Sequence, residues 1–403
     1  MPTLLQINVS ANAGSTGKIA EQIGNVAQAA GWESYIAYGK RANESSSELI
    51  RVGNKWDIIN HGIQTRLFDR HGLGSVCATR KLIKQLEDLN VDVVHLHNIH
   101  DYYINYKILF GYLKKRRFPV VWTLHDCWPF TGHCSHFDFI GCSKWQTHCG
   151  NCPGKEIYPK SLCFDRSKKN YDDKKEAFCS ILDNLILIPV SNWLEGFVRK
   201  SFLKDARRIE TIHNGIDINL FQPTKDSAIR AKYNIPKRNK IVLGVAAPWS
   251  KRKGLEDFIQ LAKKLNDGFV IVLVGLSLDQ LKEMPQGIIG IPRTENQKEL
   301  VSLYSEASVF VNPTYEDNYP TTNLEALACG TPVITYRTGG SPESITDNTG
   351  AVVEKGDITA LCECIISKSK EIGASNTFCR EWAINNCDSK LVYERYMRIY
   401  ESL

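Results

Sequence analysis

Short apolar runs alternate with amphipathic stretches along most of this chain, and that alternation restricts its fold more than any other feature. A buried parallel strand reads as a short continuous apolar run, whereas a helix repeats apolar positions at i, i+3 and i+4. The first series of predicted strands is 3–9, 34–39, 91–98, 118–126, 185–191 and 208–215. After 3–9, Ile19, Ile23 and Val26 share one helical face and Gly31 ends the helix, and a further helix is expected around 103–117.

A polar stretch with two prolines, residues 218–240, interrupts the pattern and is predicted to be a linker. A second series then begins, with strands at 240–246, 269–275, 308–313, 331–336 and 349–354 and helices at 254–265, 296–307 and 323–330. Strands joined by helical crossovers indicate α/β architecture with parallel sheets. We therefore expect two doubly wound, Rossmann-like domains facing across a cleft, one over 1–220 and one over 221–385. Ligands of such sheets bind beyond the carboxyl ends of the strands.

The composition indicates an ordinary globular protein, with 43% apolar and 23% charged residues among 403. No apolar run is long enough to cross a bilayer, and residues 1–10 lack the pattern of a signal peptide, so we expect a cytoplasmic protein. The formal net charge of +6 fits a solvated surface, an anionic substrate or an anionic membrane surface. No basic run is dense enough to indicate nucleic acid.

The loop after the first strand contains the sequence GSTGK, residues 14–18, which is similar to a phosphate-binding loop of an NTPase. The NTPase motif requires Gly where this chain has Asn12, and Ser or Thr where it has Ile19. That function is therefore excluded. Gly14 and Gly17 permit close backbone approach by a ligand, and they also suit a plain turn from strand to helix.

The segment 312–340 contains the strongest candidate site. Asp317 lies before a predicted helix whose first turn contains Pro320 and which ends near Gly330, and Glu325 lies inside that helix. The backbone N–H groups at the start of a helix attract an anion. We expect the N–H groups of Thr321, Thr322 and Asn323 to bind a diphosphate.

This segment resembles the signature of the retaining glycosyltransferases of family four, which have the GT-B fold. The resemblance rests on Asp317, the seven residues after it, Glu325 and the following ALACGTPV. The resemblance extends over essentially the whole chain. Its other parts are the Gly loop at 14–17, TLHD at 123–126, HNGID at 213–217 and KRKG at 251–254. It also implies that the closing helix, within 386–403, returns to the first domain.

The resemblance implies a role for each matching residue. Glu325 would hold the ribose of a nucleotide sugar, and Asp317 would bind hydroxyls of the donor sugar, with Glu316 adjacent. Lys253, assisted by Arg252, would neutralise the departing diphosphate. His125 would lie near the anomeric carbon, and Gly14 and Gly17 would let the first domain approach the donor. Catalytic roles are thus expected for His125, Asp317 and Lys253.

Two positions depart from the family pattern. The first acid is Asp317 where most members have Glu, and Ala247 stands where an Arg is usual. The KRKG segment also fits a solvated loop. A lysine and a helix N-terminus aimed at the leaving diphosphate lower the barrier electrostatically. We therefore expect catalysis to need no metal and no other cofactor.

Thirteen cysteines occur in the chain, and several fall in an insertion-like stretch, 127–163. Cys149 and Cys152 have the C-x-x-C spacing of metal ligands, and with Cys134 and Cys142 they could form a structural zinc site. Buried free thiols and a disulfide are the alternatives. Four aromatic residues of this stretch are expected to stack on sugars or touch lipid: Trp128, Phe130, Phe137 and Trp145.

The function expected from the resemblance is transfer of a sugar from a UDP or GDP donor to a glycan or lipid-linked glycan in bacterial surface polysaccharide synthesis. The basic surface and the aromatic stretch suggest peripheral contact with the inner face of the membrane. Two alternatives stay open. One is a sugar-nucleotide epimerase of GT-B fold, and the other is a non-catalytic, zinc-stapled glycan-binding protein.

Overall fold

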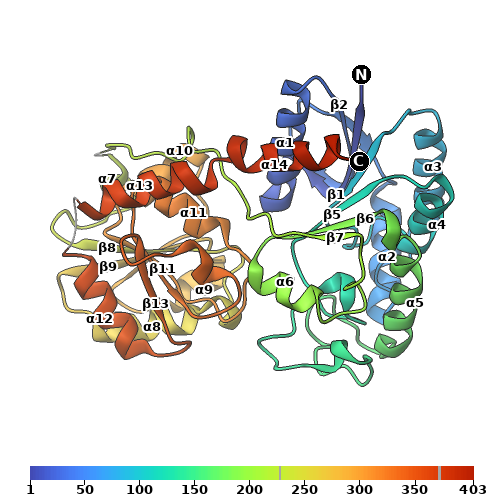
Figure 1. Ribbon diagram of the computed structural model, residues 1–403. Coiled ribbons are helices and arrows are strands. Elements are labelled where there is room, and N and C mark those ends of the chain that lie inside the picture. Colours follow the sequence, from blue (N-terminus) through green and yellow to red (C-terminus); the bar gives the residue numbers. More distant parts are fainter. Residues whose placement is uncertain (227, 371–373) are drawn as a thin grey trace. The chain divides into compact units, whose positions relative to one another are not determined.

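The computed structural model describes residues 1–226, 228–370 and 374–403, which form two compact units (Figure 1). Unit 1 consists of Met1–His213 and Lys390–Leu403, and unit 2 consists of Asn214–Ser389. The polar stretch 218–240 therefore lies inside unit 2. Its short helix α7 (Ala228–Lys232) is tied to α10 (Gln297–Glu306) by an ion pair of 2.7 Å between Arg230 and Glu306.

Unit 1 is built on a seven-stranded sheet in the order β3-β2-β1-β4-β5-β6-β7, with every pairing parallel. Its strands are β1 (Thr3–Ala11), β2 (Glu33–Ala42), β3 (Glu48–Arg51), β4 (Val93–Leu96), β5 (Val120–Leu124), β6 (Leu185–Pro189) and β7 (Arg208–Ile209). The direction of strand addition reverses between β1 and β4. This reversal is the switch point at which doubly wound sheets bind ligands.

The helices of unit 1 are α1 (Gly14–Ala29), α2 (Lys55–Phe68), α3 (Val76–Glu87), α4 (Tyr106–Arg116), α5 (Ser167–Cys179), α6 (Asn192–Val198) and α14 (Ser389–Glu401). One core cluster joins Ile19 and Ile23 of α1, apolar residues of the sheet, and Tyr393 and Tyr396 of α14. Tyr396 shares a hydrogen bond of 2.9 Å with Thr123 of β5. Residues near the C-terminal end of the sequence thus complete the core of the first unit.

Unit 2 has a six-stranded sheet in the order β10-β9-β8-β11-β12-β13, again with parallel pairings. Its strands are β8 (Lys240–Val245), β9 (Phe269–Val274), β10 (Ile288–Ile291), β11 (Val309–Asn312), β12 (Val333–Tyr336) and β13 (Gly350–Val353). Besides α7 and α10, its helices are α8 (Leu255–Lys264), α9 (Leu278–Glu283), α11 (Thr321–Ala328), α12 (Ile358–Lys368) and α13 (Ala374–Cys387). The switch point lies between β8 and β11.

The prediction of two doubly wound α/β units is therefore confirmed. The segments singled out in the sequence follow strands at these switch points. Residues 14–17 follow β1 in unit 1, and residues 251–254 and 313–320 follow β8 and β11 in unit 2. Among the described helices, none has the length and apolarity that crossing a bilayer requires.

Candidate functional site

The loops after β8 and β11 bring two predicted catalytic residues into contact. Lys253 closes the short 3₁₀ turn Lys251–Lys253, and its Nζ lies 2.5 Å from Oδ2 of Asp317. Both side chains are about one quarter exposed, which leaves them accessible to a ligand. Adjacent strands at the switch point explain this contact between residues 64 positions apart.

Arg252 holds the loop that carries the acidic residues. Its guanidinium donates to the backbone oxygen of Glu316 at 2.7 Å, and its own backbone oxygen accepts from the N–H of Tyr315 at 2.8 Å. The side chain of Glu316 is only 2% exposed. In the structure Arg252 therefore positions the loop after β11, while Lys253 and Asp317 present charged groups at its surface.

A glycine pair after β12 packs directly on the Asp317 loop. Gly339 has a φ of +55°, and a Cβ at this position would lie 1.7 Å from the backbone oxygen of Asp317. The N–H of Gly340 donates to that same oxygen at 3.3 Å. Only glycine allows so close an approach with this backbone conformation. The sequence contains a signal for this contact, since two consecutive glycines follow a predicted strand.

The N-terminus of α11 follows the Asp317 loop. Its N-cap residue is Pro320, which makes no side-chain capping hydrogen bond. The N–H of Asn323 donates to the oxygen of Pro320 at 3.2 Å, so Thr321 and Thr322 are the better candidates to donate to an anion. The Asn323 amide is buried and bonds Asn312 at 2.8 Å and the Ser341 hydroxyl at 3.0 Å, which fixes the helix entry.

Glu325 lies on the second turn of α11 and is oriented by a residue that the sequence did not indicate. The buried hydroxyl of Tyr304, on α10, donates to Oε2 of Glu325 at 3.0 Å. Burial, together with the charge of Glu325, raises the pKa of Tyr304 well above its ordinary value, so the phenol keeps its proton. Tyr304 therefore holds the carboxylate of Glu325 in one orientation.

In unit 1, the two glycines of the opening loop serve different purposes. Gly14 begins α1 with a φ of +69°, and a Cβ there would meet nothing within 4 Å. A Cβ on Gly17 would lie 2.8 Å from the Ser10 hydroxyl and 3.2 Å from the Ser10 backbone oxygen. Gly17 therefore allows close packing of α1 on β1, whereas Gly14 is the position whose open side could admit a ligand.

His125 follows β5, is partly exposed, and contacts the buried His97. His97 Nδ1 lies 3.1 Å from His125 Nε2, and His97 Nε2 lies 3.0 Å from Oε1 of Gln6. The Gln6 amide nitrogen donates to Ala20, so Gln6 Oε1 accepts from His97, and His97 in turn accepts from His125. Burial lowers the pKa of His125 to about 4, against a smaller raising effect of Asp126. His125 is therefore neutral at pH 7.

The four predicted zinc ligands lie around one small cavity, together with His133. The N–H of Gly132 donates to Sγ of Cys149 at 3.2 Å, and the buried Nε2 of His133 has no hydrogen-bond partner. Within the part of the chain that the structure describes, however, no three His, Cys, Asp or Glu side chains are arranged to hold a metal ion. Zinc binding would therefore require the thiols to turn toward the cavity, and the zinc site stays a prediction.

The expected role of the aromatic residues in 127–163 is wrong. Trp128, Phe130, Phe137 and Trp145 are each 3% exposed or less. Phe137 and Trp145 stack at a centroid distance of 5.0 Å, and Phe130 meets Trp145 at 5.3 Å. Phe130, Phe137 and Trp145 form a small core for a segment with little regular structure, because their apolar area is more favourably buried than exposed. Trp128 packs instead on Tyr106 and Phe178. They are not available to stack on sugars or to touch lipid.

Two family models match the chain, one in each unit, and both describe glycosyltransferases. Residues 17–220 match the family model described as Glycosyltransferase Family 4, and residues 225–372 match the model described as Glycosyl transferases group 1. Because the first model alone spans half of the chain, the chain belongs to Glycosyltransferase Family 4. The family match confirms the resemblance drawn from the 317–330 signature.

A similar protein aligns over the whole chain, and solved structures share its fold. The putative colanic acid biosynthesis glycosyl transferase WcaC of Escherichia coli (strain K12) is 24% identical and aligns over 99% of this chain and 100% of its own length. The sucrose-phosphate synthase structure from Thermosynechococcus elongatus has a TM-score of 0.71 at 18% identity, covering 100% of this chain and 99% of the other. Anabaena HepE in complex with UDP-glucose has a TM-score of 0.67 at 14% identity, with both chains covered fully (100%). The GT-B fold is thus confirmed.

Proposed function

We propose that this protein is a retaining, metal-independent glycosyltransferase that moves a sugar from a UDP or GDP donor to a glycan or lipid-linked glycan acceptor. The observation that carries the proposal is the contact of Lys253 with Asp317 beside the uncapped N-terminus of α11. A cation, a carboxylate and free N–H groups at one switch point fit a nucleoside diphosphate sugar, whose phosphates are anionic and whose sugar offers hydroxyls.

In the proposed reaction the bond between the anomeric carbon and the diphosphate oxygen breaks, and the acceptor oxygen bonds the anomeric carbon on the same face. The acceptor proton passes to the departing diphosphate. Lys253 and the N–H groups of Thr321 and Thr322 stabilise the charge that develops on the leaving group. Asp317 and Glu325 bind sugar and ribose hydroxyls. His125 contributes a neutral hydrogen-bonding group, since its pKa of about 4 leaves it uncharged at pH 7.

The proposals for the donor and the pathway are based on the similar proteins described above. The HepE structures contain UDP and UDP-glucose, which makes UDP-sugars the first donors to test. The name of WcaC places that relative in colanic acid synthesis, and we propose bacterial surface polysaccharide assembly, on the cytoplasmic side of the membrane, for this chain. Thermal-shift screening against UDP and GDP would identify the nucleotide, because a ligand of the native state raises Tm.

The cysteine cluster is proposed to be a structural zinc site that takes no part in transfer. The four cysteines line one cavity, and the N–H of Gly132 already donates to the sulfur of Cys149, as backbone groups do around metal-bound thiolates. Bound zinc would fix a segment that otherwise has only two short 3₁₀ turns, Trp128–Phe130 and Lys144–Gln146.

The decisive experiment measures nucleoside diphosphate release with and without acceptor, in the presence of EDTA. We expect acceptor-dependent release, loss of at least a hundredfold in kcat for Lys253→Ala, and unchanged rates for the exposed control Lys282→Ala. The anomeric configuration of the product, read by NMR, tests retention. The family assignment does not favour the epimerase or the binding protein. Acceptor-independent conversion of the donor, or turnover by Lys253→Ala at the wild-type rate, would contradict the proposed site.

A further inference from the structure

Helix α2 of unit 1 has its apolar side chains on the outside. Trp56, Ile59, Ile63 and Leu67 recur at helical spacing along one face and are 76%, 40%, 51% and 37% exposed. The opposite face of the helix is buried, and its buried residues are polar: His61 and Thr65. A surface helix normally buries its apolar stripe, so this reversed arrangement indicates that the stripe has a partner outside the unit.

The polar face of α2 is firmly bonded to its own unit, so the helix cannot simply rotate its apolar face inward. His61 Nε2 accepts from the N–H groups of Gly72 and Gly74 at 3.0 and 3.1 Å, and its Nδ1 lies 2.9 Å from the Ser75 hydroxyl. The N-terminus of the helix is fixed by a capping box in which Asn54 and Asp57 bond reciprocally. The hydrogen bonds of the opposite face therefore keep the apolar stripe exposed in the folded unit.

The apolar face continues onto the segment before α5. Phe68, at the end of α2, stacks on Phe164 at a centroid distance of 5.8 Å, and both rings are about half exposed. The N–H of Leu162, itself 55% exposed, donates to the backbone oxygen of Arg66 at 2.7 Å. We call the surface formed by Trp56, Ile59, Ile63, Leu67, Phe68, Leu162 and Phe164 the apolar face of unit 1.

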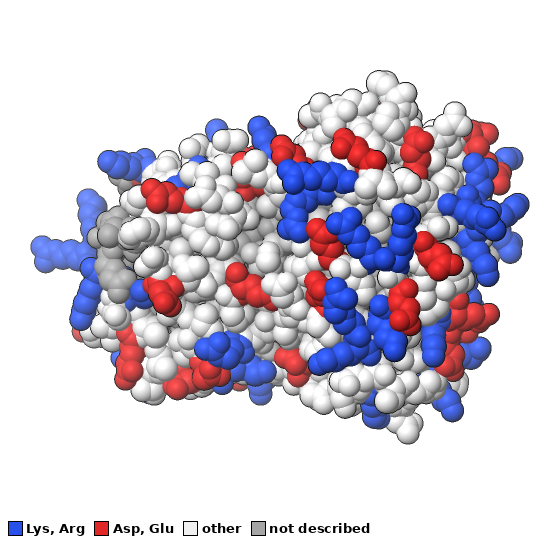
Figure 2. Space-filling view, in the orientation of Figure 1, with Lys and Arg blue, Asp and Glu red and all other residues white. Residues whose placement is uncertain are grey.

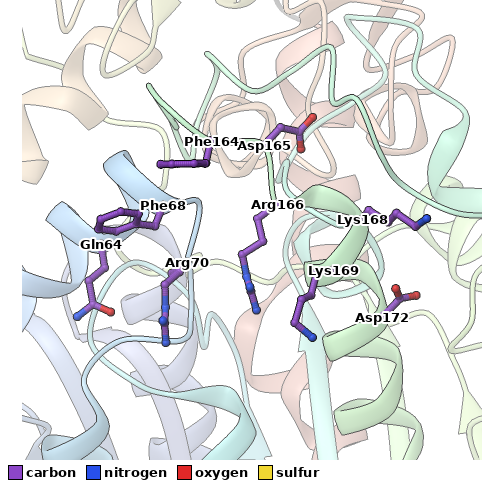
Figure 3. Close-up of a pocket in the computed structure, with 9 residues that line it drawn as sticks. All are labelled: Gln64, Phe68, Arg70, Phe164, Asp165, Arg166, Lys168, Lys169 and Asp172. Atoms are coloured by element: carbon purple, nitrogen blue, oxygen red, sulfur yellow. The ribbon is translucent and has the colours of Figure 1, made fainter.

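Basic residues surround this apolar face. Beside the two phenylalanines opens a cavity of about 840 Å³ whose lining includes Arg70, Arg166, Lys168 and Lys169. Figure 3 shows Phe68 next to Phe164, and the side chains of Arg70, Arg166 and Lys169 extending together in the same direction. Lys55 and Arg66 lie at the two ends of α2. Figure 2 shows Lys and Arg side chains interspersed with Asp and Glu on the face of unit 1 that carries α5 and α6.

The acidic residues nearby offset only part of this positive charge. The cavity lining contains four cations, Arg70, Arg166, Lys168 and Lys169, and two carboxylates, Asp165 and Asp172. Asp173 is buried and is shared by three cations, Lys107, Arg166 and Lys169. The carboxylate of Asp165 accepts from the backbone N–H groups of Cys152 and Ser167. Asp172 lies 2.8 Å from His148. The rim of the apolar face is therefore net positive and attracts an anionic surface.

We propose that the apolar face of unit 1 docks on the surface of an anionic lipid bilayer, with α2 lying in the interface and the surrounding Lys and Arg side chains meeting lipid phosphates. An exposed apolar stripe with Trp at one end and cations at both ends suits the membrane–water interface, where Trp is enriched and Lys and Arg meet lipid phosphates. The cations around the stripe favour an anionic bilayer as the partner, because Lys and Arg side chains near such a surface are attracted to its negative potential. The inference goes beyond the proposed transfer reaction.

The test is sedimentation of the full chain with vesicles, without donor or acceptor, so that its result is independent of the transfer activity. We expect binding to phosphatidylglycerol vesicles and little binding to phosphatidylcholine vesicles. The double variant Ile59→Ser/Ile63→Ser should lower partitioning by roughly tenfold or more. The control Leu278→Ser, at an apolar residue of unit 2 that is still more exposed, should bind as the wild type does.

A charge series completes the design. Arg70→Gln/Lys168→Gln should reduce binding by roughly fivefold for each cation removed, and raising the salt concentration should weaken it further. Lys237→Gln, exposed in unit 2, is the matched control. Four results would overturn the proposal: equal binding to neutral vesicles, wild-type binding by the Ile59→Ser/Ile63→Ser variant at an unchanged Tm, competition by soluble glycerol phosphate, or self-association that the same variant abolishes without any vesicle binding.

Discussion

The hydrogen bond from Tyr304 to Glu325 provides a sharp test of the donor site, because Tyr304 is a positioning residue that would itself not touch the substrate. Tyr304→Phe keeps the buried ring and removes only the hydroxyl, which donates to Glu325 Oε2 at 3.0 Å. Hydrogen bonds to charged groups contribute about 1.5 to 3 kcal/mol. Because Glu325 is partly exposed, water replaces part of the lost hydrogen bond, and we expect a loss at the lower end, about 1.5 kcal/mol.

A loss of that size corresponds to roughly tenfold in affinity. If Glu325 holds the ribose, KM for the donor should rise about tenfold in Tyr304→Phe while kcat changes little, because the ribose is bound alike in the ground and transition states. Initial rates over a range of donor concentrations, with the acceptor saturating, would measure both constants.

Tyr336→Phe is the matched control for this test. The Tyr336 hydroxyl is equally buried and donates to the Asp257 carboxylate at 2.9 Å, within the same unit. Both variants should lower Tm by similar amounts, and only Tyr304→Phe should raise KM. If Tyr304→Phe lowers Tm as the control does and leaves KM within twofold, then the assignment of Glu325 to the ribose is refuted.

Three further outcomes follow from the structure. Gly339→Ala places a Cβ 1.7 Å from the Asp317 oxygen and should lower kcat/KM by about a hundredfold in a chain whose circular dichroism is unchanged; near-wild-type activity would contradict the packing described. Burial lowers the pKa of His61 to about 4. Between pH 6.5 and 4, His61 is therefore protonated in the unfolded chain and neutral in the folded chain. Protonation linked to His61 should lower the free energy of unfolding by about 3 kcal/mol at pH 4, relative to its value above pH 6.5. NMR should show no titration of His61 between pH 7.5 and 5.5. For the cysteine cluster, purified protein should contain about one zinc per chain, and Cys149→Ser should lower both zinc content and Tm whereas the exposed Cys77→Ser should not; less than about half a zinc per chain would exclude the site.

The sequence was most informative where chemistry and fold depend on local pattern. Short apolar runs predicted most strands, and the spacing of Asp317 and Glu325 around Pro320 led to the family. The contact of Lys253 with Asp317 was only implied, because it depends on which strands become neighbours, and strand order is a property of the whole sheet.

Other features lie beyond such patterns. Nothing in residues 296–307 distinguishes the hydroxyl of Tyr304 as the one that reaches Glu325, since that contact depends on the packing of α10 against α11. The aromatic residues around Trp145 looked exposed because their segment has no periodicity, yet they bury one another. For α2 the pattern is misleading, because apolar residues at helical spacing ordinarily indicate a core-facing stripe, whereas here His61 and Thr65 take the buried positions.

The place of α14 in unit 1 has a consequence for how the chain folds during synthesis. Unit 2 is continuous in sequence, so all of its residues are available before residues 390–403 are made. Until then, the sheet of unit 1 lacks Tyr396, which bonds Thr123, and Tyr400, whose hydroxyl lies 2.6 Å from His95 Nδ1. A nascent chain would therefore have a completed second unit and a first unit in which α1 covers the sheet but the place of α14 is still empty. The part of unit 1 that carries the proposed membrane face would therefore emerge from the ribosome before unit 1 has its full stability.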